Sequence, residues 1–448
     1  MKFKIRTICA ALTLAFSTSA VQADDLLQIY QQALTSDPIA LQAQAQRDAL
    51  YEQIEENRAP LLPTISASVG YDKSWRNEDT MSNTDASGIN AGVTLNQVIY
   101  DHSAWVGLSL AELAASQADA AYASSLQTLI IRVTSAYFAV LSAKDTFEFQ
   151  GSEKRAIERQ LEQTKQRFAV GLTAITDVHE AQAQYDLARA QEILAENELI
   201  NSYEALREIT GIEHKTINIL DTERFSAVSP SPARTADWLK MAESNSVDLL
   251  TTRIGKDIAQ ETISLYKAGH MPTLSLNAGY TTNIQQENSS ESESVNDFDN
   301  GTVGLTLSIP IFEGFKVSSK VNQAQYQYVE ASEKMEQTHR KVVKDVRNNF
   351  NNVGASISSI RAYEQSVISS ESALKATQAG FEVGTRTIVD VLNRTRDLYD
   401  SKRKLSDARY GYINSILALK QAAGTLNEDD VIAINNGLTA QATQTTTQ

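Results

Sequence analysis

The stretch GFEVGTRTIVDVLN, residues 380–393, repeats the pattern of an earlier stretch, RFAVGLTAITDVHE, residues 167–180. Both contain Val-Gly, three further residues, Ile, one residue and then Asp-Val. Gly171 and Gly384 can adopt the left-handed conformation that ends a helix. Thr387 and Asp390 have the spacing of a capping box that begins the next one. The sequence therefore predicts two helix–turn–helix units related by duplication.

The duplication continues on both sides of these turns. RAPLLPTISASVGY, residues 58–71, matches KAGHMPTLSLNAGY, residues 267–280. GVTLNQVIYD, residues 92–101, matches GLTLSIPIFE, residues 304–313. A repeat of this length is too long for a solenoid and indicates a duplicated domain.

The repeat sets the expected domain organisation. We expect a first structural repeat over 24–220 and a second over 236–424, each in the order helix, two strands, long helix, turn, helix. Residues 221–235, which contain two prolines, are the expected linker, placed in a belt at the middle of the molecule. Residues 425–448 are the expected C-terminal segment, disordered from about residue 437.

The first 23 residues have the pattern of a secretory signal peptide. Three basic residues among the first six precede an apolar run over 8–16, and Val-Gln-Ala precedes Asp24. The only cysteine, Cys9, would leave with this signal, so the mature chain would lack disulfides. Removing three positive charges makes the formal charge of −15 more negative, which argues against nucleic acid as a partner.

The apolar residues of the long segments recur at coiled-coil spacing. One stripe consists of Val343, Val346, Phe350, Val353, Ile357 and Ile360. A period near 3.5 favours left-handed packing between neighbouring helices. Two long helices are expected, at 102–169 and 316–380. The first is about as long as the expected helices 174–210 and 26–58 placed end to end. The second is about as long as 387–422 and 236–268 together. We infer a rod in which each long helix lies beside two stacked shorter helices.

Four short segments alternate apolar and small polar residues, as strands do. They are 64–72, 90–100, 273–282 and 302–311, and long polar loops are expected between them at 72–88 and 283–300. Each strand has the length of a membrane-crossing β-strand. Four aromatic residues, Tyr71, Tyr100, Tyr280 and Phe312, stand at the predicted strand ends, where a membrane interface would lie. No stretch of 18 apolar residues predicts a transmembrane helix.

Four strands are too few for a membrane barrel made by one chain. Open strand edges are not tolerated in lipid, and single-chain barrels begin at eight strands. Several chains must then share one barrel. Two chains would give eight strands and a filled interior, and three would give twelve strands and room for a pore.

The chain resembles the TolC family of outer-membrane efflux and secretion channels. The resemblance extends from residue 24 to about 436 and includes the duplication, RAPLLP at 58–63, VGLTAITDV and VGTRTIVDV. It implies a mixed α+β membrane protein of a Gram-negative bacterium, a homotrimer with one 12-stranded barrel in outer-membrane lipid and a coiled-coil helical barrel spanning the periplasm. It also implies two partners, a periplasmic adaptor protein and an inner-membrane transporter of the RND, ABC or MFS type.

The resemblance also implies roles for residues of the two turns, which would form the inner tip. Family members carry two acidic rings there, and the positions in this chain are Asp390 and Asn393, so one ring has lost its charge. Asp390 would form a gate ring of three carboxylates that attracts cations. The alternative is that Asp390 and Asp177 only cap helices.

A latch at the tip is implied as well. In the family an arginine and a tyrosine hold the tip shut, and the matching residues are Arg386 and Phe381. Arg386 could pair with Asp177 or with the hydroxyl of Thr176. Phe381 has no hydroxyl, so one family contact is missing or is replaced by packing.

Two other functions compete with the channel. An enzyme is not expected, because no nucleotide-binding loop, GxSxG or HExxH motif occurs, and the five histidines are scattered. No metal site and no cofactor are expected. A soluble periplasmic coiled-coil scaffold or adaptor would explain the helices but not the strands.

Overall fold

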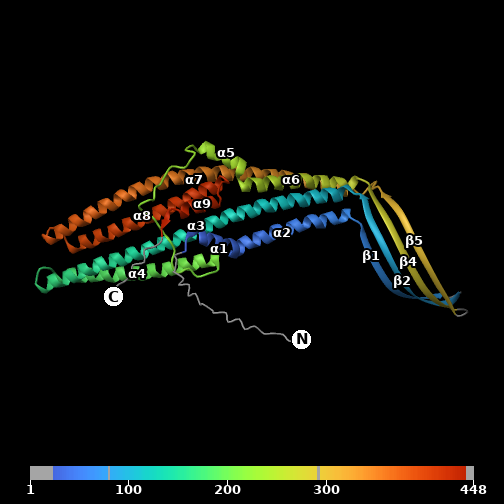
Figure 1. The fold of residues 1–448 in the computed structure, drawn as a ribbon, viewed down its shortest axis with the longest axis horizontal. Helices are drawn as coiled ribbons and strands as arrows, with labels where there is room; N and C mark the ends of the chain where they lie inside the picture. Colours follow the sequence, from blue (N-terminus) through green and yellow to red (C-terminus); the bar gives the residue numbers. More distant parts are fainter. Residues whose placement is uncertain (1–23, 79–80, 290–292, 440–448) are drawn as a thin grey trace, which may run out of the picture.

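The protein is an elongated rod with a sheet at one end and two helical turns at the other (Figure 1). The computed structural model describes residues 24–78, 81–289 and 293–439. The predicted signal peptide and the last nine residues lie outside the described residues.

Two long helices run along most of the rod. They are α3 (His102–Ala169) and α7 (Lys316–Glu382). Toward the tip, α3 packs against α4 (Ile175–Thr210) and α7 against α8 (Ile388–Ala422). Toward the sheet, α3 packs against α2 (Pro38–Arg58) and α7 against α6 (Val247–Lys267). Each long helix thus lies beside two shorter ones, in agreement with the lengths read from the sequence.

The predicted continuous helices 26–58 and 236–268 are wrong, because each is broken after its first eleven residues. The first break separates α1 (Leu26–Ser36) from α2, and the second separates α5 (Thr235–Asn245) from α6. Pro38 cannot continue the first helix, and buried Asp37 caps the next one by accepting from the Ala40 amide at 2.9 Å. Ser246 takes the same extended conformation and caps α6, so the second break forms without proline. Short 3₁₀ turns, η1 (Ala59–Leu61) and η2 (Ala268–His270), then lead into the sheet.

The four long strands form one antiparallel sheet in the order β1-β2-β4-β5. Their bounds are β1 (Thr64–Glu78), β2 (Met81–Tyr100), β4 (Thr273–Ser289) and β5 (Glu293–Ser308). The predicted long loops are therefore wrong, since most of their residues continue the strands. Polar side chains did not prevent pairing, because the backbone ladder supplies the hydrogen bonds. The fourth strand ends three residues early, before Pro310, which has no amide hydrogen to donate.

The two faces of the sheet differ in polarity. Ile65, Leu95, Ala278 and Val303 pair in register across the four strands and so share a face. The next row along each strand, Ser66, Thr94, Gly279 and Thr302, lies on the opposite face. One face is thus apolar and the other small and polar.

The aromatic residues expected at strand ends are divided between two levels. Tyr100 ends β2 and Phe312 follows β5, close to the helices. Tyr71 and Tyr280 lie inside their strands, each seven residues beyond the strand start, which corrects their predicted position at the ends. At about 3.3 Å per residue, Tyr71 and Tyr280 each lie roughly 23 Å along the strand from its first residue.

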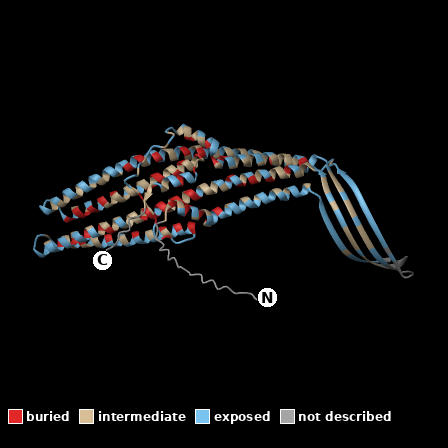
Figure 2. Ribbon diagram, in the orientation of Figure 1, coloured by how far each residue is buried: buried red, intermediate tan, exposed pale blue. Residues whose placement is uncertain are grey.

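The main core lies at mid-rod, where the shorter helices meet (Figure 2). The linker packs there, with the Tyr412 hydroxyl donating to the carbonyl of Val228 at 2.9 Å. The C-terminal segment contains two elements that the sequence reading missed, α9 (Glu428–Asn435) and β6 (Leu438–Thr439). Because β6 pairs with β3 (Ile219–Leu220), the prediction of disorder from residue 437 is wrong for Leu438 and Thr439.

Among the described residues, one helix has the length and composition to cross a membrane. It is α3, whose most apolar 18-residue window has a mean hydropathy of 1.4. Half of that window is buried within the chain, and α3 packs against α2, α4, α6 and α8. Packing between these helices accounts for its apolar character.

Candidate functional site at the helical tip

The two turns at the tip end their helices in the same way. Gly171 and Gly384 have φ values of +76° and +79°, in the left-handed region that glycine tolerates. After α3, the Leu172 amide donates to the carbonyl of Arg167 at 2.9 Å. After α7, the Thr385 amide donates to the carbonyl of Gly380, also at 2.9 Å. These bonds form the Schellman motif that the glycine pattern predicts.

The second turn begins α8 with a complete capping box. The Asp390 carboxylate accepts from the backbone amide of Thr387 at 3.0 Å and from its hydroxyl at 2.9 Å. The Thr387 hydroxyl in turn receives the Asp390 amide at 3.2 Å. The hydrogen bond from the Thr387 backbone is the largest of the influences that lower the pKa of Asp390. Asp390 therefore caps the helix and stays ionised, so the capping role and a charged ring are compatible.

The first turn differs at the same positions. Ala174 occupies the cap of α4 and has no side chain that could bond the helix amides. Asp177 instead accepts a hydrogen bond from the hydroxyl of Thr173. This leaves Asp177 half-buried at the tip and outside a capping box.

Arg386 lies over the end of α7 and is exposed. A Cβ placed on Gly380 would come within 2.8 Å of the Arg386 Cγ, so the stem of the arginine passes where only glycine leaves room. Within the described part of one chain, Arg386 forms no hydrogen bond or ion pair with Asp177 or Thr176. Its exposed guanidinium instead lies near enough to Asp390 to help lower the pKa of that carboxyl.

Phe381 has a partner that the sequence reading missed. The guanidinium of Arg167, at the end of α3, lies 4.7 Å from the centre of the Phe381 ring. Such a cation–π contact stabilises by about 0.5–1 kcal/mol at an exposed site. Phe381 also packs on a small apolar cluster that joins the two coiled coils, consisting of Ile157, Leu161, Ala181, Ala188, Ile388, Val391 and Leu392. Phe381 has no hydroxyl to form the family's hydrogen bond, and in this chain its ring joins the two coiled coils by packing.

Asn393 lies one turn beyond Asp390 on α8 and is half-buried. Gly380 and Arg167 could have been found from the repeat, because they occupy matching positions in the two turn sequences. The first turn sequence has Arg167 where the second has Gly380, so the two copies of the turn have diverged at this position.

The comparison with protein families follows the same two halves. The family model for outer membrane efflux proteins matches residues 29–212 and 238–425. The chain belongs to the outer membrane efflux protein family.

Relatives in this family are similar over nearly their whole length. The outer membrane protein TolC of Vibrio cholerae is 47% identical over 97% of this chain and 98% of its own length. The outer membrane protein TolC of Escherichia coli is 45% identical over 97% of this chain and 89% of its own. The crystal structure of the Campylobacter jejuni CmeC outer membrane channel superposes with a TM-score of 0.76 at 14% identity, covering 98% of both chains, which shows the shared fold.

Proposed function

We propose that three copies of this outer-membrane efflux protein assemble into one channel, with a 12-stranded barrel in the membrane and a helical tunnel in the periplasm. The observation that carries the proposal is the four-stranded sheet, in which β1 and β5 each have one unpaired edge. Unpaired edges are not tolerated in lipid. Pairing β5 of one chain with β1 of the next closes the sheet, and three chains leave a pore that two would not.

The sheet offers an apolar band of the right height for a membrane. Val69, Val303 and Leu305 are 80%, 80% and 68% exposed in the single chain, on the apolar face. A face of this kind needs lipid or protein against it. Seven residues of strand separate the aromatic residues near the helices from Tyr71 and Tyr280, which is close to the about 9–11 residues of a tilted membrane-crossing strand. The strands beyond Tyr71 and Tyr280 would then extend outside the membrane.

The tip would be the closed end of the tunnel. Threefold symmetry would place three copies of Asp390 around the axis, and the Asn393 ring beside it would be uncharged. Within the described residues Arg386 forms no ion pair, and Asp177 is half-buried at the tip. We therefore assign the latch to a contact between neighbouring chains.

The channel serves efflux and type I secretion. Its tip would receive a periplasmic adaptor and an inner-membrane transporter, whose docking would break the links at the tip and open the tunnel. The tunnel would open because the packed helices at the tip shift relative to one another. The transporter class is left open by the residues of the tip.

The polarity of the sheet supplies a prediction. Leu305→Arg should sharply reduce the amount of channel in the outer-membrane fraction. An arginine on the lipid-facing side of a barrel costs about 2–4 kcal/mol near the bilayer midplane. The neighbouring Thr306→Arg, on the polar face, should be recovered at nearly wild-type levels. Equal loss in both variants would mean that the apolar face does not contact lipid.

The proposed function is tested by purification in detergent followed by conductance measurements in planar bilayers. The account predicts discrete channels of low conductance, since the tip is closed. A soluble scaffold, the alternative considered from the sequence, would be recovered without detergent and would form no channels.

A further inference from the structure

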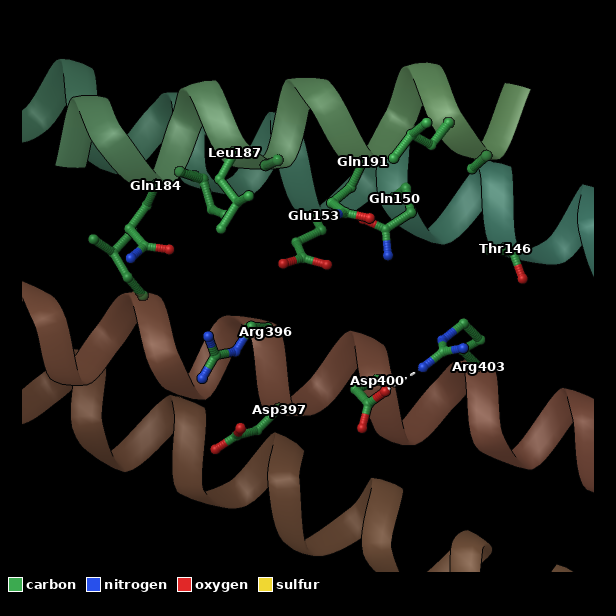
Figure 3. Close-up of a pocket in the computed structure, with 15 residues that line it drawn as sticks. Thr146, Gln150, Glu153, Gln184, Leu187, Gln191, Arg396, Asp397, Asp400 and Arg403 are labelled. Carbon is green, nitrogen blue, oxygen red and sulfur yellow. Dashed lines mark hydrogen bonds and ion pairs between the residues drawn. The ribbon is translucent and has the colours of Figure 1, made fainter. Parts of the chain in front are cut away.

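A polar cavity separates the two coiled coils of the chain above the tip. It has a volume of about 630 Å³ and lies between α3 and α4 on one side and α8 on the other (Figure 3). Ile157 and Leu392 line it and also belong to the apolar cluster near the tip. The cavity is therefore a polar interruption of the interface that joins the coiled coils.

Glu153 points from α3 into this cavity, toward α8 (Figure 3). The residue is only 7% exposed. Among the described residues it has no hydrogen-bond donor and no ion-pair partner within 4 Å. A buried carboxylate in this situation is costly in its ionised form.

Asp145, two turns earlier on the same helix, has the hydrogen-bond donors that Glu153 lacks among the described residues. Asp145 is half-buried between α3 and α8, and it accepts hydrogen bonds from the hydroxyls of Ser406 and Tyr410, the latter at 2.7 Å. These two donors lower its pKa, although burial is stronger and raises it. The same interface thus supplies donors to one carboxylate and withholds them from the other.

The charged groups around Glu153 come mainly from α8. Arg396, Asp397, Asp400 and Arg403 line the cavity, and Asp400 is already paired with Arg403 at 2.6 Å. The lining residues of α4 carry no charge and include Gln184 and Gln191. On its own helix, Lys154 is engaged by Glu192 of α4 at 2.5 Å. The arginines of α8 face Glu153 without reaching it.

We propose that Glu153 and the facing cluster Arg396, Asp400 and Arg403 form a proton-sensitive clasp between the two coiled coils. With Glu153 protonated, the coiled coils pack closely and the tip stays closed. With Glu153 ionised, the carboxylate favours fuller hydration than the partly open cavity allows, and separation of α8 from α3 becomes favourable. This inference rests on the proposed channel function and adds a control of its opening.

The sign of the pH dependence follows from the burial of Glu153. Burial raises its pKa from 4.5 to about 7, opposed by the arginines and aided by Asp400. When the coiled coils separate, the carboxyl returns to its ordinary pKa. The closed arrangement is then fully favoured below about pH 4.5 and loses this advantage as the pH rises through 7. Between pH 5.5 and 8 the closed-to-open ratio should fall about 30-fold per chain.

The test compares channels that contain Glu153 with channels that carry Glu153→Gln, in planar bilayers at these two pH values. Both proteins carry Asp390→Asn, so that titration of the tip ring does not contribute. The clasp predicts that the Glu153-containing channel opens more often at pH 8 and that Glu153→Gln stays closed at both values. Glu158→Gln, which removes an exposed carboxylate from the same helix, should behave as the Glu153-containing channel does.

A second measurement reports the movement directly. The only cysteine of the chain is Cys9, so spin labels can be placed on the exposed turns through Leu172→Cys and Val383→Cys. Double electron–electron resonance on the detergent-solubilised protein should show longer distances between the two labelled turns at pH 8. Glu153→Gln should abolish this change. If channels form but wild type and Glu153→Gln respond to pH alike in both measurements, the clasp is overturned. If no channel forms at either pH, the proposed function fails.

Discussion

Arg386→Ala should convert a nearly closed channel into one with several-fold higher conductance in planar bilayers. Arg386 is exposed at the tip and has no ion-pair partner within the described part of its own chain, whereas a link to Asp177 of a neighbouring chain would occur three times in a trimer. An exposed ion pair contributes up to about 1 kcal/mol. Loss of three such links would shift the closed-to-open ratio by up to roughly 100-fold.

The matched control is Arg394→Ala, which also removes an arginine from the tip region. Arg394 is paired within its own helix, to Asp397 at 3.0 Å, and should leave the conductance unchanged. Asp177→Ala should reproduce the effect of Arg386→Ala, and the double variant should add little to either one. Wild-type conductance in both single variants would rule out this latch.

Asp390→Asn should weaken channel block by multivalent cations added on the tip side, by on the order of 100-fold. A unit-charge pair at 4 Å in water is worth about 1 kcal/mol, and the substitution removes three charges from a narrow ring. The hydrogen bonds of Asp390 to Thr387 lower its pKa, so the ring is charged at neutral pH.

Asparagine is chosen because its amide oxygen can still accept from the Thr387 amide and cap α8. A change in block can then be assigned to charge rather than to fraying of the helix. Asp186→Asn, on α4, removes a carboxylate away from the turns and should have no effect. Unchanged block in Asp390→Asn would leave Asp390 with its capping role alone. A further variant, Asn393→Asp, should strengthen block by restoring a second charged ring.

The helical rod could be predicted closely from the sequence. The bounds of α3 could be predicted because no proline interrupts residues 102–169, and the left-handed glycines locate both turns. The helix break at Ser246 could not be read in this way, because serine is common within helices and only the packed structure shows it as a cap. The extent of the strands was underestimated, since the polar extensions carry no alternation of apolar residues.

The tip was predicted in part. The capping box of Asp390 follows from spacing alone, and the structure contains it. The contact between Arg167 and Phe381 joins the ends of two helices more than 200 residues apart, and no local pattern encodes it. Glu153 is one of many glutamates on α3, and only the arrangement of the helices buries it without a partner. The sequence does not predict the role of a residue whose contact partner lies far away along the chain.

The most direct test of the account is the number of chains in one particle. Native mass spectrometry of the protein extracted from outer membranes in detergent counts them without assumptions about gating. The shared barrel predicts three chains, which supply twelve strands and close every sheet edge. A single chain or a pair would contradict the account, because neither would give a closed barrel with a pore.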